Sequence, residues 1–172
     1  TIVDCAITNT ILMGKYAGSK LGPSQENIFI GCFSGQYHFS GRYNMGLGHE
    51  TFRSPGSSVT SNTGRYNVAF GFRSSRCMSS GCANTTLGRQ SGKCISSGNT
   101  NVFIGCDAGC TTTTGSHNVM IGQGVHASSA SGNVQLGIGC GATRWICGDS
   151  VLNVCLGGST IRACANTGAF YA

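Results

Sequence analysis

Apolar and polar positions alternate along the chain in short segments that recur at a nearly fixed spacing. Each segment begins with a polar residue, most often Asn, and continues with three largely apolar residues and a Gly. The first and third apolar positions are uniform, whereas the middle position ranges from Phe to Gly and Gln. A period of two is typical of a β-strand that buries one face. The copies read TILMG, NIFIG, NMGLG, NVAFG, NTTLG, NVFIG, NVMIG, NVQLG and NVCLG.

The spacing of these copies predicts the fold. They start near residues 10, 27, 44, 67, 84, 101, 118, 133 and 153, and five of the eight intervals share one 17-residue spacing. No helical period appears, and a fixed repeat of this length indicates stacked units that contact only their neighbours. We therefore predict an all-β fold, a parallel β-solenoid or β-roll of about nine rungs, as one domain over 1–172. The longer intervals indicate insertions at 49–66 and 141–152.

The uniform apolar columns are expected to form the core ladder of this solenoid. A small residue follows seven positions after each Asn, as expected where backbone crosses a narrow interior. Three positions before the next Asn lies a Gly, which predicts a corner with positive φ. The corner glycines are Gly41, Gly64, Gly81, Gly98 and Gly115. The core ladder is carried by Val102, Ile104, Val119, Ile121, Val134 and Leu136.

A 17-residue rung encloses little, so the middle column is expected to stay partly exposed. That column includes Phe29, Phe103 and Met120. Extended exposed apolar rows mark interfaces. We therefore predict that parallel chains associate around a long axis as a homotrimer. The alternative is a monomer whose middle column covers its own core.

The run NVFIGCDAGCTTTTGSHNVMIG (101–122) resembles the N-x-x-I-G-x-x-A-G repeats of tail-fibre-like proteins of phages and large viruses. It is also similar to the shorter head repeats of bacterial trimeric autotransporter adhesins. The resemblance extends over about residues 10–157. It implies parallel β-rolls, commonly trimeric, in fibres that display or contact receptors. The 17-residue length exceeds that of the adhesin repeats and favours a filament on a virion or another extracellular body.

Composition narrows the choice of partners. Only 9% of the 172 residues are charged, and the net charge of +6 arises from eleven scattered bases against five acids. No run of basic residues indicates a nucleic-acid partner, whereas weak attraction to anionic glycans stays open. No stretch approaches the ~20 apolar residues of a membrane-spanning helix, so no membrane partner is expected. The chain starts at Thr1, which indicates a processed form or one segment of a longer protein.

Eleven cysteines in a short chain indicate an oxidising compartment. Cys77 and Cys94 are separated by one 17-residue repeat and so occupy one column of adjacent rungs. Their expected Cα separation of ~4.8 Å is within the range for a disulfide, roughly 4.4–6.8 Å. We predict that the two are close and are candidates for a disulfide, the alternative being small buried thiols. CDAGC (106–110) lacks a second ligand pair, so no metal site and no cofactor are expected.

No catalytic set is expected. The acids Asp4, Glu26, Glu50, Asp107 and Asp149 fall on different rungs, which argues against a glycosidase carboxylate pair. A dyad of His126 with Cys106 or Cys110 stays open, although coincidence explains it more simply because Cys is common throughout.

Insertions are where solenoids make contacts. Arg144 and Trp145, in the second insertion, form a candidate contact pair because Arg and aromatic residues dominate binding hot spots. The alternative is that Trp145 covers the base of its own loop.

The pattern as a whole predicts a non-enzymatic structural protein of a fibre, spike or filament on a virion surface or other extracellular body. Its rim loops are expected to contact neighbouring structural proteins or a cell-surface glycan or protein receptor. The alternatives are the head of a bacterial cell-surface adhesin and a glycan-degrading tailspike.

Overall fold

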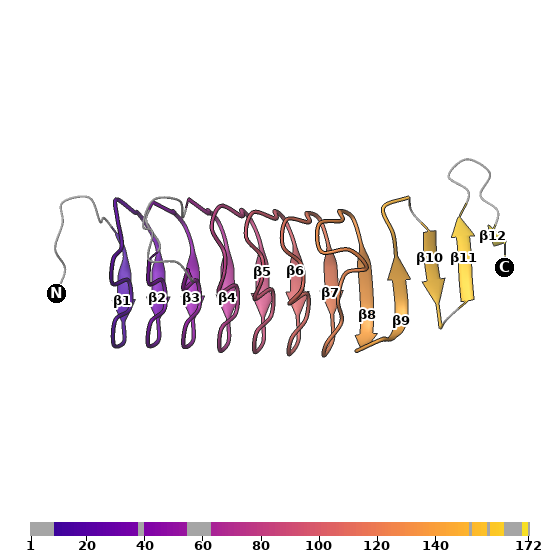
Figure 1. Ribbon diagram of the computed structural model, residues 1–172, viewed down its shortest axis with the longest axis horizontal. Helices are drawn as coiled ribbons and strands as arrows, with labels where there is room; N and C mark the ends of the chain where they lie inside the picture. The colour runs from indigo at the N-terminus through magenta and orange to yellow at the C-terminus, as the bar shows by residue number, and fades with distance from the viewer. Residues whose placement is uncertain are drawn as a thin grey trace.

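The computed structural model describes residues 9–37, 40–54, 63–151, 153–157, 159–163 and 170–171. These residues form one twelve-stranded sheet, and no helix occurs among them. Figure 1 shows the strands side by side in chain order along the length of the molecule. The strands are β1 (Ile11–Met13), β2 (Ile28–Ile30), β3 (Met45–Leu47), β4 (Val68–Phe70), β5 (Thr85–Leu87), β6 (Val102–Ile104), β7 (Val119–Ile121), β8 (Leu136–Cys140), β9 (Thr143–Gly148), β10 (Asn153–Leu156), β11 (Ser159–Ala163) and β12 (Phe170–Tyr171).

Strands β1 to β8 pair in parallel, each with the strand one coil later, so the predicted β-solenoid is confirmed. Each pairing step advances the register by one 17-residue repeat, except that Met45 of β3 pairs with Val68 of β4 across the longer interval. Val119 pairs with Leu136, so Gln135 takes the Asn position of the last coil. The predicted rung start at 133 is therefore two positions early, because Asn133 imitates the repeat without being in register.

The solenoid has about seven turns rather than nine rungs, because the chain changes direction after β8. Strands β8 to β12 continue the same sheet as an antiparallel meander (Figure 1). The segment NVCLG, predicted to start a rung at 153, is instead the antiparallel strand β10. The predicted insertion at 141–152 is consequently no loop on a rung, since half of it is β9.

The first predicted insertion, 49–66, is shorter than expected. Residues 49–54 follow the regular turn, because the backbone N–H of Glu50 donates to Cys32 O of the preceding coil at 2.9 Å. Tyr66 likewise donates to Arg42 O at 3.1 Å. The additional chain of the longer interval therefore lies between these two segments, and positions 55–62 are outside the described part of the chain.

The two faces of the strands are the reverse of the prediction. The middle column points inward, and Phe29, Phe103 and Met120 have no exposed surface. The predicted core ladder points outward: Val102, Ile104, Val119, Ile121 and Leu136 are only half-buried. Val134 precedes β8 at a φ of 55° and is 46% exposed.

The reason for this reversal is the width of the coil, which admits one strand side chain per layer. Large middle residues are accommodated by glycines eight positions after the Asn. A Cβ on Gly35 would lie 2.3 Å from the Phe29 ring, and one on Gly109 would lie 2.5 Å from Phe103. In the third coil the large and the small residue change places. The middle strand position is Gly46, and Phe52, eight positions after the Asn, fills the space that Gly46 leaves. The small column seven positions after the Asn is buried as predicted, at Ser34, Thr51, Ser74, Ser91, Ala108 and Val125.

A ladder of buried asparagine side chains runs through the solenoid beside this core. Asn84 Nδ2 donates to Gly98 O at 2.8 Å, and Asn84 Oδ1 accepts from the backbone N–H of Asn101 at 2.9 Å. The same amide also bonds its neighbours in the ladder, such as Asn101 Nδ2 to Asn84 Oδ1 at 2.9 Å. Each amide therefore serves backbone groups that the coil buries away from water. The ladder consists of Asn27, Asn44, Asn67, Asn84, Asn101 and Asn118.

The predicted corner glycines have a different role from the one expected. Gly64, Gly81, Gly98 and Gly115 are not among the residues with positive φ. They are required because successive coils approach closely here: a Cβ on Gly98 would lie 2.2 Å from Gly115 O. Positive φ occurs instead at the residue directly before each ladder Asn, such as Thr100 at 56°, and at the Gly that ends each strand, such as Gly105 at 128°.

The asparagine ladder should dominate the stability of the coil. Asn84→Ala removes four buried hydrogen bonds, to Gly98, to Asn67 and two to Asn101. At about 1 kcal/mol per bond, with a further penalty for stranded buried groups, we expect a loss of roughly 3–5 kcal/mol. Denaturant unfolding of Asn84→Ala and of Thr85→Ala, the exposed next residue at the start of β5, provides the measurement. Equal stability of the two variants would contradict the role given to the ladder.

Candidate functional site

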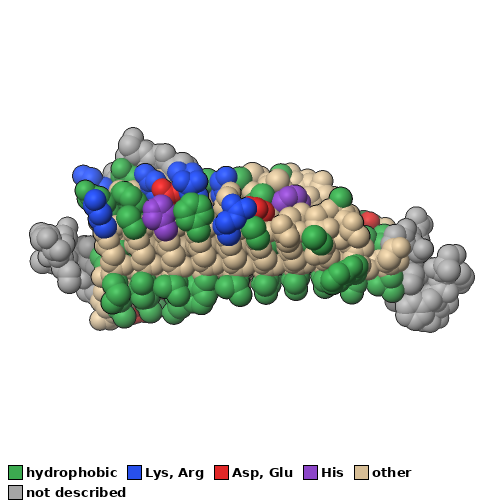
Figure 2. All heavy atoms as spheres, turned by 90° about the horizontal axis from the view of Figure 1, so that it is seen from below, with side chains coloured by type: hydrophobic (Ala, Val, Ile, Leu, Met, Phe, Trp, Pro, Cys, Tyr) green, Lys and Arg blue, Asp and Glu red, His purple; other side chains and the backbone are tan. Residues whose placement is uncertain are grey.

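The outward side of the sheet carries a continuous apolar face. It is formed by the first and third residues of each parallel strand, and Thr85 is the one polar member. Several members are strongly exposed, among them Met13 at 63% and Leu47 at 46%. Figure 2 shows a row of apolar side chains along one edge of the molecule, over the length of the described coils. The apolar face comprises Ile11, Ile28, Met45, Val68, Thr85, Val102, Val119 and Leu136, with Met13, Ile30, Leu47, Phe70, Leu87, Ile104, Ile121 and Ile138.

The antiparallel strands extend the apolar face beyond the solenoid. Ile138 pairs with Ile146, and Ile146 pairs with Leu156. The eight parallel strands alone give the face a length of seven strand spacings, roughly 34 Å. No charged residue belongs to it. By contrast, the core cluster within the described chain holds only nine fully buried apolar residues. Such a long exposed face is typical of a surface that another molecule covers.

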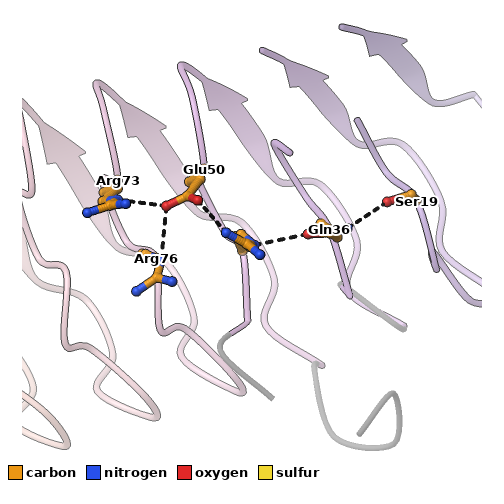
Figure 3. Close-up of polar contacts among 6 residues, drawn as sticks. Ser19, Gln36, Glu50, Arg73 and Arg76 are labelled. Atoms are coloured by element: carbon orange, nitrogen blue, oxygen red, sulfur yellow. Dashed lines mark hydrogen bonds and ion pairs between the residues drawn. The ribbon is translucent and has the colours of Figure 1, made fainter. Parts of the chain in front are cut away.

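The turns that follow β1 to β4 carry a polar network across several coils. Glu50 is bound by Arg53 of its own turn and by Arg73 of the next turn, whose Nε donates to Oε2 at 2.6 Å. Arg76 Nε lies 3.3 Å from the same oxygen without forming a hydrogen bond. The network continues backward, because Arg53 Nε donates to Gln36 Oε1 at 2.9 Å and Gln36 donates to Ser19 at 3.1 Å (Figure 3). We call Glu50, Arg53, Arg73 and Arg76 the rim cluster.

The rim cluster holds Glu50 in its ionised form. Burial alone would raise the pKa of this carboxyl, since its side chain is only 6% exposed. The hydrogen bond from Arg73 and the charges of Arg53, Arg73 and Arg76 outweigh burial and lower the pKa below its ordinary value of 4.5. The sequence showed Glu50 as an isolated acid. The signal that was missed is the repeat itself, which stacks position 50 beside position 73 despite the longer interval.

The cysteine predictions are resolved in part. The backbone N–H of Cys77 donates to Lys93 O at 3.0 Å, so Cys77 does lie beside the segment that carries Cys94. Both thiols are free, and no bond joins them. Burial, followed by the neighbouring Cys94, raises the pKa of Cys77. Cys5 and Cys164 lie outside the described residues.

The dyad that the sequence left open is partly assembled. Cys110 Sγ lies 3.9 Å from His126 Nδ1, whereas Cys106 contacts Asp107 and Arg89. Burial raises the pKa of Cys110, and the charge of Asp107 raises it further. A raised pKa works against the thiolate that a nucleophilic cysteine needs. Nowhere in the described ranges do three His, Cys, Asp or Glu side chains gather as metal ligands would.

Arg144 and Trp145, the predicted contact pair, have different surroundings. Arg144 Nη2 donates to His126 O at 2.7 Å, and its side chain covers the end of the core next to Gly137. Trp145 is the additional residue at the register shift between β8 and β9, and it is 67% exposed. It therefore does not cover the base of its own loop. Both residues border an open depression that Ala142, Thr143, Cys147 and Gly157 also line.

Comparison with protein-family models, with curated proteins and with solved structures finds no match to this chain. Among the residues that the structure describes, no helix is long and apolar enough to span a membrane.

The rim cluster predicts an acid-sensitive stability. A carboxyl whose pKa is lowered on folding stabilises the protein at pH values above its pKa in the unfolded chain. This contribution disappears as the pH falls through the lower pKa of the folded protein. Thermal unfolding between pH 6 and about 3 should therefore show a steep loss. Glu50→Gln should flatten that profile, whereas Glu26→Gln, an exposed acid, should leave it unchanged. A Glu50→Gln profile that runs parallel to that of the parent would contradict the assignment.

The thiols should differ in reactivity. Cys140 is exposed, whereas Cys77 is half-buried with a raised pKa. Under reducing conditions at neutral pH, iodoacetamide should label Cys77 at least severalfold more slowly than Cys140, as peptide mapping measures. Denatured protein, in which the two should react alike, is the control. Repeating the mapping without reductant tests the disulfide, since a Cys77–Cys94 bond would remove both labels together.

Proposed function

We propose that this chain is a non-enzymatic structural protein, a β-solenoid segment of a fibre, spike or filament. The observation that carries the proposal is the apolar face, which runs without a charged residue along a coil that buries little of its own apolar surface. A slender coil with this face exposed is poorly suited to remain alone in water. Its use is to be covered by an identical neighbour, which produces an elongated assembly.

The form of assembly we propose is a parallel homotrimer about an axis along the solenoid. Stacked coils repeat at ~4.8 Å on every copy. Two parallel copies in register therefore match layer for layer, and all rows of the apolar face meet at once. In a ring with closed cyclic symmetry, every subunit presents the same surface to the axis. We propose three chains because the resemblance to tail-fibre-like repeats implies a trimer.

The setting we propose is a virion surface or another extracellular filament. The sheet ends in an antiparallel meander with the exposed Trp145, and the turns carry the rim cluster. The rim cluster lies on the turns and not on the strands of the apolar face, so it remains available, with the exposed Trp145, for neighbouring structural proteins or a receptor. The adhesin and the glycan-degrading tailspike remain the alternatives. The raised pKa of Cys110 gives no support to the cysteine dyad.

A charge on the apolar face should dissociate the assembly without unfolding the coil. Leu87→Glu replaces a side chain that is 46% exposed, so the isolated coil tolerates it, whereas three such charges would meet near the axis. We expect light scattering to give the mass of a trimer for the parent and of a monomer for the variant. Thr111→Glu, which adds the same charge on an exposed turn position, should remain a trimer.

Both variants should keep their β-structure by circular dichroism, so that a change in mass reports on association alone. A parent protein that is monomeric at all concentrations would overturn the proposed assembly. A dimeric parent that Leu87→Glu dissociates would retain the interface and correct the number of chains.

A further inference from the structure

The repeat stacks three basic side chains in one column of consecutive coils. Arg53, Arg76 and Lys93 each lie nine positions after the ladder asparagine of their coil, at Asn44, Asn67 and Asn84. Equivalent positions of neighbouring coils are separated by ~4.8 Å. The three cations therefore form a short line along the solenoid axis, which we call the basic row. Arg73 and Arg89 flank it on the same turns.

The acids beside the basic row do not neutralise it. Glu50 contacts Arg53, Arg73 and Arg76, and Asp107 pairs with Arg89 at 2.6 Å. Five cations thus face two carboxylates, an excess of three positive charges over four coils. Like charges at this spacing repel each other. An anion shared between the rows would relieve this repulsion, and Arg73 and Arg76 keep 38% and 25% of their side chains exposed for such a contact.

The guanidinium groups are held in place from below. Arg53 lies over the Phe33 ring at 4.9 Å and Arg73 over the Phe72 ring at 4.7 Å. These rings belong to an aromatic stack along the axis, in which Phe33 contacts His49 and His49 stacks on Phe72 at 5.4 Å. Cation–π contacts and the shared Glu50 restrict the arginine side chains before any ligand arrives. Figure 2 shows the Lys and Arg side chains gathered on the turns, apart from the apolar edge.

From this geometry we infer that the basic row is a binding site for a linear acidic polysaccharide, one that carries sulfate or carboxylate groups. A line of cations parallel to the axis fits a chain whose anionic groups recur along its length. Guanidinium forks bind sulfate and carboxylate oxygens in pairs. The half-buried Ser19, a neutral member of the same column, has a hydroxyl that suits sugar hydroxyls, whereas the amide of the buried Gln36 is used by Arg53 and Ser19.

Other polyanions fit less well. Single-stranded nucleic acid binds by stacking bases on open aromatic faces, and the rings beneath the row already face each other or a cation. An acidic peptide binds readily by adding a strand to a sheet edge, but the basic row lies on turns, where no strand edge is available. This site goes beyond the proposed function, since it requires neither a trimer nor a virion.

The test measures the affinity of the protein for heparin, hyaluronan and neutral dextran by titration calorimetry at several salt concentrations. We expect saturable, salt-sensitive binding of heparin or hyaluronan and none of dextran. Heparin carries both sulfate and carboxylate groups, whereas hyaluronan carries carboxylate alone, so binding of hyaluronan would show that carboxylate suffices. Arg76→Gln with Lys93→Gln should weaken binding on the order of tenfold to a hundredfold and make its salt dependence shallower.

The matched control is Arg42→Gln with Arg65→Gln. These two exposed arginines also stack on consecutive coils but lie on the opposite edge, so the control removes the same charge from the same kind of pair. It should bind as the parent does. Lys93→Gln alone, which leaves Glu50 and its partners untouched, should weaken binding by a smaller factor and guards against loss of binding through misfolding.

Several results would overturn the site. If the control variant lost as much affinity as the variant of the basic row, the loss would be explained by net charge alone. Polyglutamate or single-stranded DNA that binds as tightly as the polysaccharides would overturn the ligand class. Absence of binding by both heparin and hyaluronan at physiological salt would remove the site altogether. A monomeric protein that binds heparin would contradict the proposed assembly and leave this inference intact.

Discussion

The narrow interior of the coil is the constraint on which the rest of the structure depends. Each turn of the coil has space for one strand side chain, one small residue, one asparagine amide and at most one further apolar side chain, such as Met78 or Ile95. Backbone from adjacent turns comes so close that a Cβ on Gly98 would overlap Gly115 O. Buried peptide groups in such a space have no access to water and must find partners. The amide of Asn84, with donors and acceptor used at once, satisfies groups from the turns on either side.

A thin interior also leaves many apolar side chains on the surface of the coil. Small folds bury a small share of their apolar surface and gain little stability from it. The nine fully buried apolar residues of the described core are outnumbered by the sixteen positions of the apolar face on β1 to β8. The coil thus directs more large apolar side chains outward than inward. Covering that surface would supply the hydrophobic stabilisation that one coil lacks.

The sequence predicts the class of fold well because the repeat period is a property of the backbone. A constant repeat length and a period of two specify strands that stack in register, and β1 to β7 confirm this. The predicted facing of the strands is wrong for a physical reason. Uniform apolar columns, such as those of Val102 and Ile104, suggest a core, although uniformity is what a surface needs to meet an identical surface. The true core varies because its layers fit one another, as Gly46 and Phe52 do where other coils pair Phe with Gly.

The candidate site was less predictable from the sequence. Which residues stack depends on the register of the coils, and the sequence is misleading about that register in two places. Asn133 matches the repeat better than Gln135, yet the backbone N–H of Gln135 bonds Asn118 Oδ1 at 2.8 Å and continues the ladder. The longer interval before Asn67 likewise separates Glu50 from Arg73 in sequence by 23 positions, although the two are adjacent in space.

In a stacked repeat, the residues at one position of successive coils form a row along the axis. Neighbours in such a row interact, so a residue type acts differently there than it does alone. Repeated Val or Ile gives a continuous apolar surface, whereas repeated Arg gives a line of mutual repulsion. The chain interrupts its cationic rows: Glu50 lies in the column of Arg73, and Asp107 adjoins Arg89. Such substitution lowers the repulsion within the rim but does not cancel it. The rim therefore keeps a local positive field.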